Sequence, residues 1–287
     1  MITPLSKFKC TEDIVGLLDD DTKLTLPICH NILFVSYKLL DPEEDEYVVF
    51  EQNEAPIAGL FHKQVRFFKY YIQSYEAKNP DICYLLNRII YEAYIKMRYL
   101  IDNSQDIKEY RSLSFKPHVE ILNDPILSRT PNATVLKRKF EKAMEVEGLT
   151  VDDIKRARKS PGGKNFRQMQ ELYEHPALYS PIYSATSDAI HSGWNEIRQM
   201  YLRCDEDNKK YVVDVEYSQV LHYRMLITIA DIMADSLSAY YQWLTRIYPG
   251  IIPGLLPTIR ELKRLCVLIG KAALDTYKGN PDEYMYK

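Results

Sequence analysis

Apolar residues recur at helical spacing along most of the chain. In the first long run, Ile57, Phe61 and Val65 fall on one side of a helix with 3.6 residues per turn. Pro80 then separates this helix from a second one, expected over residues 81–102, because proline disfavours helical backbone in the residue before it and fits a helix's first turn. The pattern therefore predicts long amphipathic helices.

The rest of the chain follows the same pattern, with few interruptions. Further helices are predicted over residues 27–40, 104–114, 132–147, 150–159, 165–175, 181–202, 216–247 and 257–277. Residues 203–210 are polar and predict a loop before a short extended piece at 211–213, and Ser160-Pro161-Gly162-Gly163 is typical of a flexible link. We expect an all-α fold, in which a helical bundle domain over residues 54–287 follows a small acidic N-terminal appendage over residues 1–53.

The composition narrows the class of protein further. At 46% hydrophobic and 27% charged residues, the chain falls in the globular range. Its five cysteines are odd in number and include no Cys-x-x-Cys pair, so they indicate neither a disulfide framework nor a zinc site. The longest apolar stretch, residues 225–244, carries Asp231 and Asp235 and therefore predicts a core helix whose carboxylates join a polar network. Without a secretory signal pattern, we expect a cytoplasmic protein with no membrane partner.

Positive charge is concentrated in one segment, although the net charge of the chain is only -3. Residues 129–167 carry eleven basic and five acidic side chains, and such a surplus suits contact with phosphate. The candidate nucleic-acid-binding residues in it are Lys155, Arg156, Arg158, Lys159, Lys164 and Arg167. The alternative is that the segment forms solvated surface helices with no ligand.

Two groups of polar residues border the apolar faces of predicted helices. Arg88 and Glu92 are four residues apart, so they lie on neighbouring turns of one face, where a partly buried ion pair either holds a ligand or bridges helices. In the predicted helix over residues 181–202, Ser187, His191 and Arg198 share a narrow stripe. His191 is the best candidate for acid-base chemistry, because its ordinary pKa lies near neutral pH, and the alternative is a histidine hydrogen-bonded inside a bundle.

Self-sufficient catalytic signatures are absent from the sequence. It contains no Gly-x-Ser-x-Gly elbow, no His-Glu-x-x-His pair and no glycine-rich nucleotide loop. We therefore expect neither a metal nor a cofactor.

The motifs Arg88-x-x-x-Glu92 and Tyr183-x-x-x-Ser187-x-x-x-His191 resemble those of a helical, mostly bacterial family, domain-of-unknown-function family 5677, over roughly residues 55–248. The resemblance implies an all-helical domain in which the Arg, Glu, Ser and His positions converge on one pocket, without an established reaction. More distantly, the layout is similar to the helical HEPN proteins, many of which are metal-independent ribonucleases of toxin and phage-defence systems with an Arg shortly before a His. The literal match here is Arg111-x6-His118, which Pro117 interrupts.

Two functional hypotheses follow from these patterns. In the first, His191, Arg88, Glu92 and Ser187 form a catalytic pocket that cleaves or binds RNA in a toxin or phage-defence role. In the second, the same residues form a structural network inside a noncatalytic interaction module that binds a protein partner or a second copy of the chain.

Overall fold

A computed structural model describes residues 8–18, 20, 22–41, 48–124, 126–158, 160–174, 197, 202–205, 210–213, 223–250 and 254–277. Helices make up most of these residues, and the predicted all-α fold is confirmed. Contacts divide the chain into two compact units: unit 1 comprises Met1–Val48, Leu60–Tyr94 and Ala177–Lys287, and unit 2 comprises Val49–Gly59 and Ile95–Pro176.

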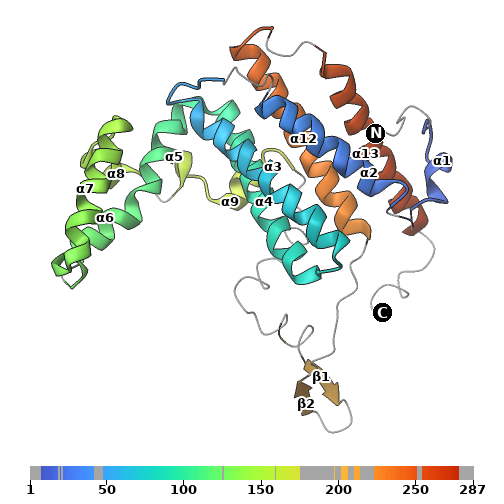
Figure 1. Ribbon diagram of the computed structural model, residues 1–287, viewed down its shortest axis with the longest axis horizontal. Helices are drawn as coiled ribbons and strands as arrows, with labels where there is room; N and C mark the ends of the chain where they lie inside the picture. The colour runs from blue at the N-terminus through green and yellow to red at the C-terminus, as the bar shows by residue number, and fades with distance from the viewer. Residues whose placement is uncertain are drawn as a thin grey trace. The chain divides into compact units, whose positions relative to one another are not determined.

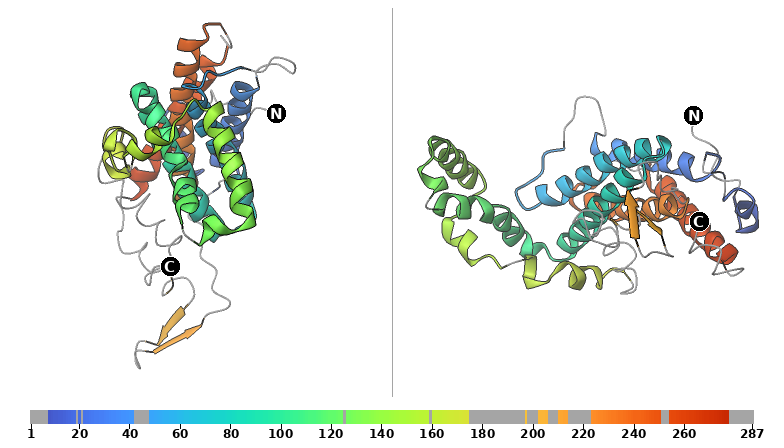
Figure 2. Two further views of the ribbon diagram at one scale, coloured as in Figure 1. Left: turned by 90° about the vertical axis from the view of Figure 1, so that its left-hand side faces the viewer. Right: turned by 90° about the horizontal axis from the view of Figure 1, so that it is seen from below.

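Unit 1 is a bundle of long helices. Its elements are α1 (Glu12–Val15), α2 (Thr25–Leu40), most of α3 (Ala55–Glu76) and α4 (Pro80–Asp102), α12 (Tyr223–Ile247) and α13 (Leu256–Tyr277). Helices α2, α12 and α13 contact one another, and α1 contacts α13 (Figure 1). The views of Figure 2 also show α2, α12 and α13 side by side.

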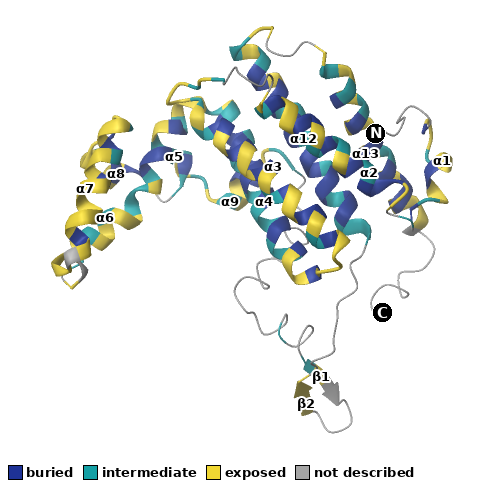
Figure 3. Ribbon diagram, in the orientation of Figure 1, coloured by how far each residue is buried: buried dark blue, intermediate teal, exposed yellow. Residues whose placement is uncertain are grey.

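Helix α12 supplies much of the core of unit 1. Buried residues follow one another along it (Figure 3), and the rings of Phe61 on α3 and Tyr240 on α12 stack at 4.0 Å between centroids. The hydroxyl of Ser236 donates a hydrogen bond of 2.5 Å to Oε1 of Gln64, and both side chains are fully buried. Asp235 forms an ion pair with Lys263 of α13.

Unit 2 is built from short helices around a small core. Its α-helices are α5 (Ile107–Ser114), α6 (Lys116–Asn123), α7 (Pro131–Val146), α8 (Val151–Arg156) and α9 (Phe166–Gln170), and its 3-10 turns are η2 (Ser104–Asp106), η3 (Leu127–Arg129) and η4 (Pro161–Gly163). Phe140, Met144 and Ile154 form the buried cluster, against which Val119 and Leu122 of α6 and Phe115, the residue before α6, pack. A capping box at Thr150 starts α8, because its hydroxyl accepts from the backbone N–H of Asp153, whose carboxylate accepts from Thr150 N–H in return.

The predicted flexible link at residues 160–163 is wrong. These residues form η4, in which Pro161 is buried and the backbone N–H of Gly162 donates a hydrogen bond of 3.0 Å to Oε2 of Glu109 on α5. Gly162 has φ +60°, a left-handed conformation that favours glycine. Glycine and proline predict a turn at these residues, and a carboxylate about fifty positions earlier in the chain holds this turn in place.

A short β-hairpin replaces part of the loop predicted at residues 203–210. Strands β1 (Leu202–Asp205) and β2 (Lys210–Val213) pair antiparallel, with Leu202 opposite Val213. The extended piece expected at residues 211–213 is confirmed, but its partner strand lies inside the segment predicted as a loop. Residues 203–210 contain few apolar residues that would indicate a strand. Strand β1 forms because it pairs with β2.

The described residues leave two expectations from the sequence as predictions. The helix expected at residues 181–202 lies almost entirely outside the described residues. The boundary between an appendage over residues 1–53 and a bundle domain over residues 54–287 stays a prediction, and α2 packs within unit 1. Within the described part of the chain, no helix combines the length and the apolar character needed to cross a membrane.

Candidate functional site on helix α4

Helix α4 begins at a well-defined cap. Pro80 occupies its first position, and the side-chain Oδ1 of Asn79 accepts a hydrogen bond of 3.3 Å from the backbone N–H of Ile82. Such a cap satisfies an amide that the helix leaves without a partner, while proline has no amide to satisfy. The cap fixes where α4 starts and therefore which residues of α4 share a face.

Arg88 and Glu92 lie one turn apart on the part of α4 that belongs to unit 1. Both side chains are half-buried, and each interacts with other groups in the structure. Their burial fits the expectation from the sequence that they border an apolar face. A half-buried guanidinium held by its surroundings is suited to meet a phosphate, which it contacts through two parallel N–H donors.

Asn87 adds a group that the sequence pattern did not single out. It is 6% exposed, and its Oδ1 has no hydrogen-bond donor among the described residues. A buried amide oxygen without a donor costs about 1–3 kcal/mol. An asparagine in the middle of an apolar helix was the available signal, because that residue is a poor helix former there.

Ser187, His191 and Arg198 lie outside the described residues. Their convergence with Arg88 and Glu92 therefore stays a prediction.

The predicted nucleic-acid-binding residues belong to unit 2, and the carboxylate of Glu109 engages one of them closely. Its Oε2 lies 2.9 Å from Nη2 of Arg158, and its Oε1 accepts a hydrogen bond of 2.8 Å from the backbone N–H of Arg158. Hydrogen bonds from the Arg158 side chain, more than any other cause, lower the pKa of Glu109 to about 2. Arg158 and Glu109 thus connect the segment after α8 to α5. Lys159 lies outside the described residues.

The other four candidates differ in how far they are engaged. Lys155 and Arg156 are exposed in the last turn of α8. Arg167 pairs with Glu171 at 2.9 Å, one turn further along the chain, and Lys164 is half-buried. Nucleic-acid binding by this segment stays a prediction, and among the five described candidates Lys155 and Arg156 on α8 are the exposed ones outside an ion pair.

Arg111 and His118, the literal Arg-x6-His match, have separate structural roles. Nε of Arg111 donates a hydrogen bond of 2.7 Å to Glu147, and the side chain is 9% exposed. His118 lies on the next helix, α6, with its ring stacked on Phe140 at 6.0 Å between centroids. The guanidinium that this motif needs is therefore committed to an ion pair in unit 2.

A model of the family of unknown function DUF5677 matches residues 54–210. This region spans more than half of the 287 residues and contains Arg88, Glu92, Ser187 and His191. The chain belongs to this family. No curated protein and no solved structure matches the chain.

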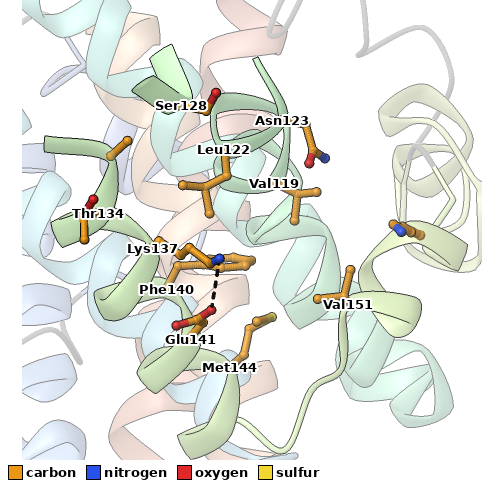
Figure 4. A pocket seen from close by; sticks show the side chains of 12 residues that line it. Val119, Leu122, Asn123, Ser128, Thr134, Lys137, Phe140, Glu141, Met144 and Val151 are labelled. Atoms are coloured by element: carbon orange, nitrogen blue, oxygen red, sulfur yellow. Dashed lines mark ion pairs between the residues drawn. The ribbon is translucent and has the colours of Figure 1, made fainter. Parts of the chain in front are cut away.

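The DUF5677 region also contains a pocket in unit 2 (Figure 4). Its volume is about 560 Å³, and helices α6, α7 and α8 with η3 line it. Phe140 lies at its centre, Leu122 and Val119 face it from α6, and Met144 extends from the next turn of α7. A pocket of this size with an apolar floor falls in the range of ligand sites.

Charged groups rim this pocket. Lys137 and Glu141 of α7 form an ion pair of 4.0 Å at its edge, and Lys155 of α8 also lines it. Lys155 thus lies at this pocket, whereas Arg156 and Arg158 line a smaller pocket of about 310 Å³. Across the described residues, no cluster of three or more His, Cys, Asp or Glu side chains is suited to hold a metal ion.

Proposed function

We propose that this member of DUF5677 cleaves RNA without a metal ion, at a pocket formed by Arg88, Glu92, Ser187 and His191. The observation that carries the proposal is the half-buried position of Arg88 and Glu92 one turn apart on α4, where each side chain interacts with other groups. A guanidinium held in this way is suited to contact a phosphate through two parallel N–H donors. The resemblance to HEPN ribonucleases supports a toxin or phage-defence role.

The chemistry assigns one task to each side chain. His191 accepts the proton of a ribose 2′-hydroxyl, whose oxygen attacks the adjacent phosphorus while the bond to the 5′ oxygen breaks, and that oxygen takes up a proton from water. Arg88 stabilises the negative charge on the phosphorus-bound oxygens in the transition state. Glu92 orients Arg88, and Ser187 donates a hydrogen bond to the phosphate.

Incubation of the purified protein with mixed RNA in the presence of a chelator tests the proposal, with new 5′-hydroxyl ends as the readout. His191→Ala and Arg88→Ala should each lower the rate about 10²-fold or more, since one acid-base or charge-stabilising group contributes that much. His191→Ala should fold almost normally, because we expect His191 at the edge of an apolar face.

Matched controls come from the same chain. Arg246→Ala, at an exposed position near the end of α12, controls for the loss of an arginine. His118→Ala tests the histidine of the Arg111-x6-His118 match. Both control variants should cleave like the wild type. Cleavage that depends on His118 instead of His191, or the absence of cleavage by the wild type under every condition, would contradict the proposal.

A second candidate function is a noncatalytic interaction module, and the pocket of unit 2 favours it. An apolar floor with a charged rim suits a short amphipathic segment of a protein partner or of a second copy of the chain. Leu122→Asp would place a charge in this floor and should abolish such binding, which light scattering detects for self-association. His191→Ala should leave it unchanged.

A further inference from the structure

Helix α3 presents a cationic outer face in unit 1. His62, Lys63, Arg66 and Lys69 are exposed along it, as the exposed stripe of α3 in Figure 3 shows. Throughout its 22 residues, the sequence of α3 has a single acidic residue, Glu76, at its C-terminal end. The positive charge in the middle of the helix is therefore not balanced by acids of the same helix.

Aromatic rings lie beside these cations. Tyr70 is 41% exposed, and its ring contacts that of Phe67 edge to face at 6.4 Å between centroids. The ammonium of Lys63 lies 6.0 Å from the centroid of the Phe67 ring. At about 100° per residue, Arg66 and Lys69 form one row and the two rings with Lys63 form the adjoining row. Cations and planar rings therefore share one surface, which spans an arc of roughly 160° around the helix.

The opposite side of α3 explains why this surface can carry such residues. Phe61, Val65 and Phe68 are fully buried, so packing in unit 1 uses the other face of the helix. The outer residues are not needed for the core. An exposed tyrosine beside unbalanced cations is a feature of interaction surfaces, in which aromatic residues and arginine are enriched.

We propose that this α3 face binds a single-stranded polynucleotide. Arg66, Lys69 and Lys63 contact consecutive phosphates, and a base stacks on the exposed ring of Tyr70. The choice of ligand class rests on the proposed function, whereas the surface and the requirement for unpaired bases go beyond it. A duplex hides the faces of its bases, and an acidic protein surface offers phosphate-like charge without stacked rings, so the combination of rings and cations favours a single strand.

The test measures binding of a labelled oligouridine by fluorescence anisotropy over a series of salt concentrations. The full chain carries His191→Ala and a chelator is present, so that cleavage does not interfere. Each neutralised phosphate contributes a slope of about -0.7 to the salt dependence of single-strand binding. The variant Lys63→Gln/Arg66→Gln/Lys69→Gln should therefore lose a slope of about 2 and bind at least tenfold more weakly.

The aromatic row has its own readout. Tyr70→Ala should weaken binding of the single strand about fivefold to tenfold without changing the salt slope, because stacking involves no release of ions. The same substitution should not alter binding of an RNA duplex of equal length. Oligothymidine should behave like oligouridine, since the surface recognises phosphates and base faces but no 2′-hydroxyl.

A matched control removes the same charge from exposed positions outside the basic segment of residues 129–167. Arg246→Gln/Arg260→Gln/Lys271→Gln on α12 and α13 should leave the affinity within about twofold of the parent. All six substituted side chains are exposed. Circular dichroism checks that each variant folds. If a triple variant does not fold, the corresponding single substitutions replace it.

Three results would overturn the inference: unchanged binding by the α3 variant, equal weakening by the control on α12 and α13, or a neutral Tyr70→Ala. Its failure is distinguishable from failure of the proposed function. Binding that depends on α3 in a protein that never cleaves RNA would keep the inference and remove the nuclease, and cleavage that survives every α3 substitution would do the opposite.

Discussion

Gly162→Ala should destabilise unit 2 more than any other glycine substitution in its described residues. Gly162 has φ +60° and ψ 13°, where an L side chain costs about 1–2 kcal/mol. A Cβ at this position would also lie far inside contact distance of the Tyr99 hydroxyl and the Asp106 carboxylate. Those two groups share a hydrogen bond of 2.5 Å, and Asp106 must move to make room.

The expected magnitude is the sum of two effects. Breaking a hydrogen bond to a charged acceptor costs about 1.5–3 kcal/mol, which, added to the backbone strain, gives roughly 2.5–5 kcal/mol. Gly148→Ala is the matched control, because Gly148 has nearly the same φ, +58°, and its nearest atom is 3.8 Å from the added Cβ. It should cost only the backbone strain, about 1–2 kcal/mol.

Native-state hydrogen exchange measures this difference locally. The backbone N–H groups of Gly162 and Arg158, both donated to Glu109, report opening of the contact between η4 and α5. Their exchange should accelerate far more in Gly162→Ala than in Gly148→Ala. Adding Tyr99→Phe to Gly162→Ala should recover part of the loss by removing one of the clashing atoms. Equal effects of the two alanines would refute the reasoning, because contact with Tyr99 and Asp106 would then contribute nothing.

Three further predictions concern buried and paired polar groups. The pKa of Glu109 is lowered to about 2, so its stabilising effect is present above an unfolded pKa of about 4.3 and is lost as the pH falls toward 2. Glu109→Gln should flatten an acid titration of stability over this window by about 3 kcal/mol, as urea unfolding at each pH would show, and an unchanged titration would contradict it. Ser236→Ala should destabilise unit 1 by about 1–3 kcal/mol in the same assay, because Oε1 of Gln64 loses its donor, and a neutral effect would mean that water replaces the hydroxyl. Asn87→Leu should leave stability unchanged or raise it by about 1 kcal/mol, because it removes a buried oxygen without a donor, and a large loss of stability would contradict this.

The sequence by itself determined the long helices. The spacing of Ile57, Phe61 and Val65 predicted α3, and Pro80 located the start of α4, because apolar periodicity and proline geometry act within a few residues. The half-burial of Arg88 and Glu92 followed from the same periodicity. Local patterns suffice wherever the chain's nearest neighbours decide its conformation.

Only the tertiary structure decided what the short segments and isolated charges do. The link at residues 160–163 became an anchored turn because Glu109, on another helix, accepts the N–H of Gly162, and β1 exists because β2 pairs with it. In the sequence, Arg111 matches an Arg-x6-His motif, but in the folded chain its guanidinium pairs with Glu147. Hydrogen bonds and ion pairs depend on distances of about 3 Å between groups that the sequence separates by tens of residues, and periodicity carries no record of such distances.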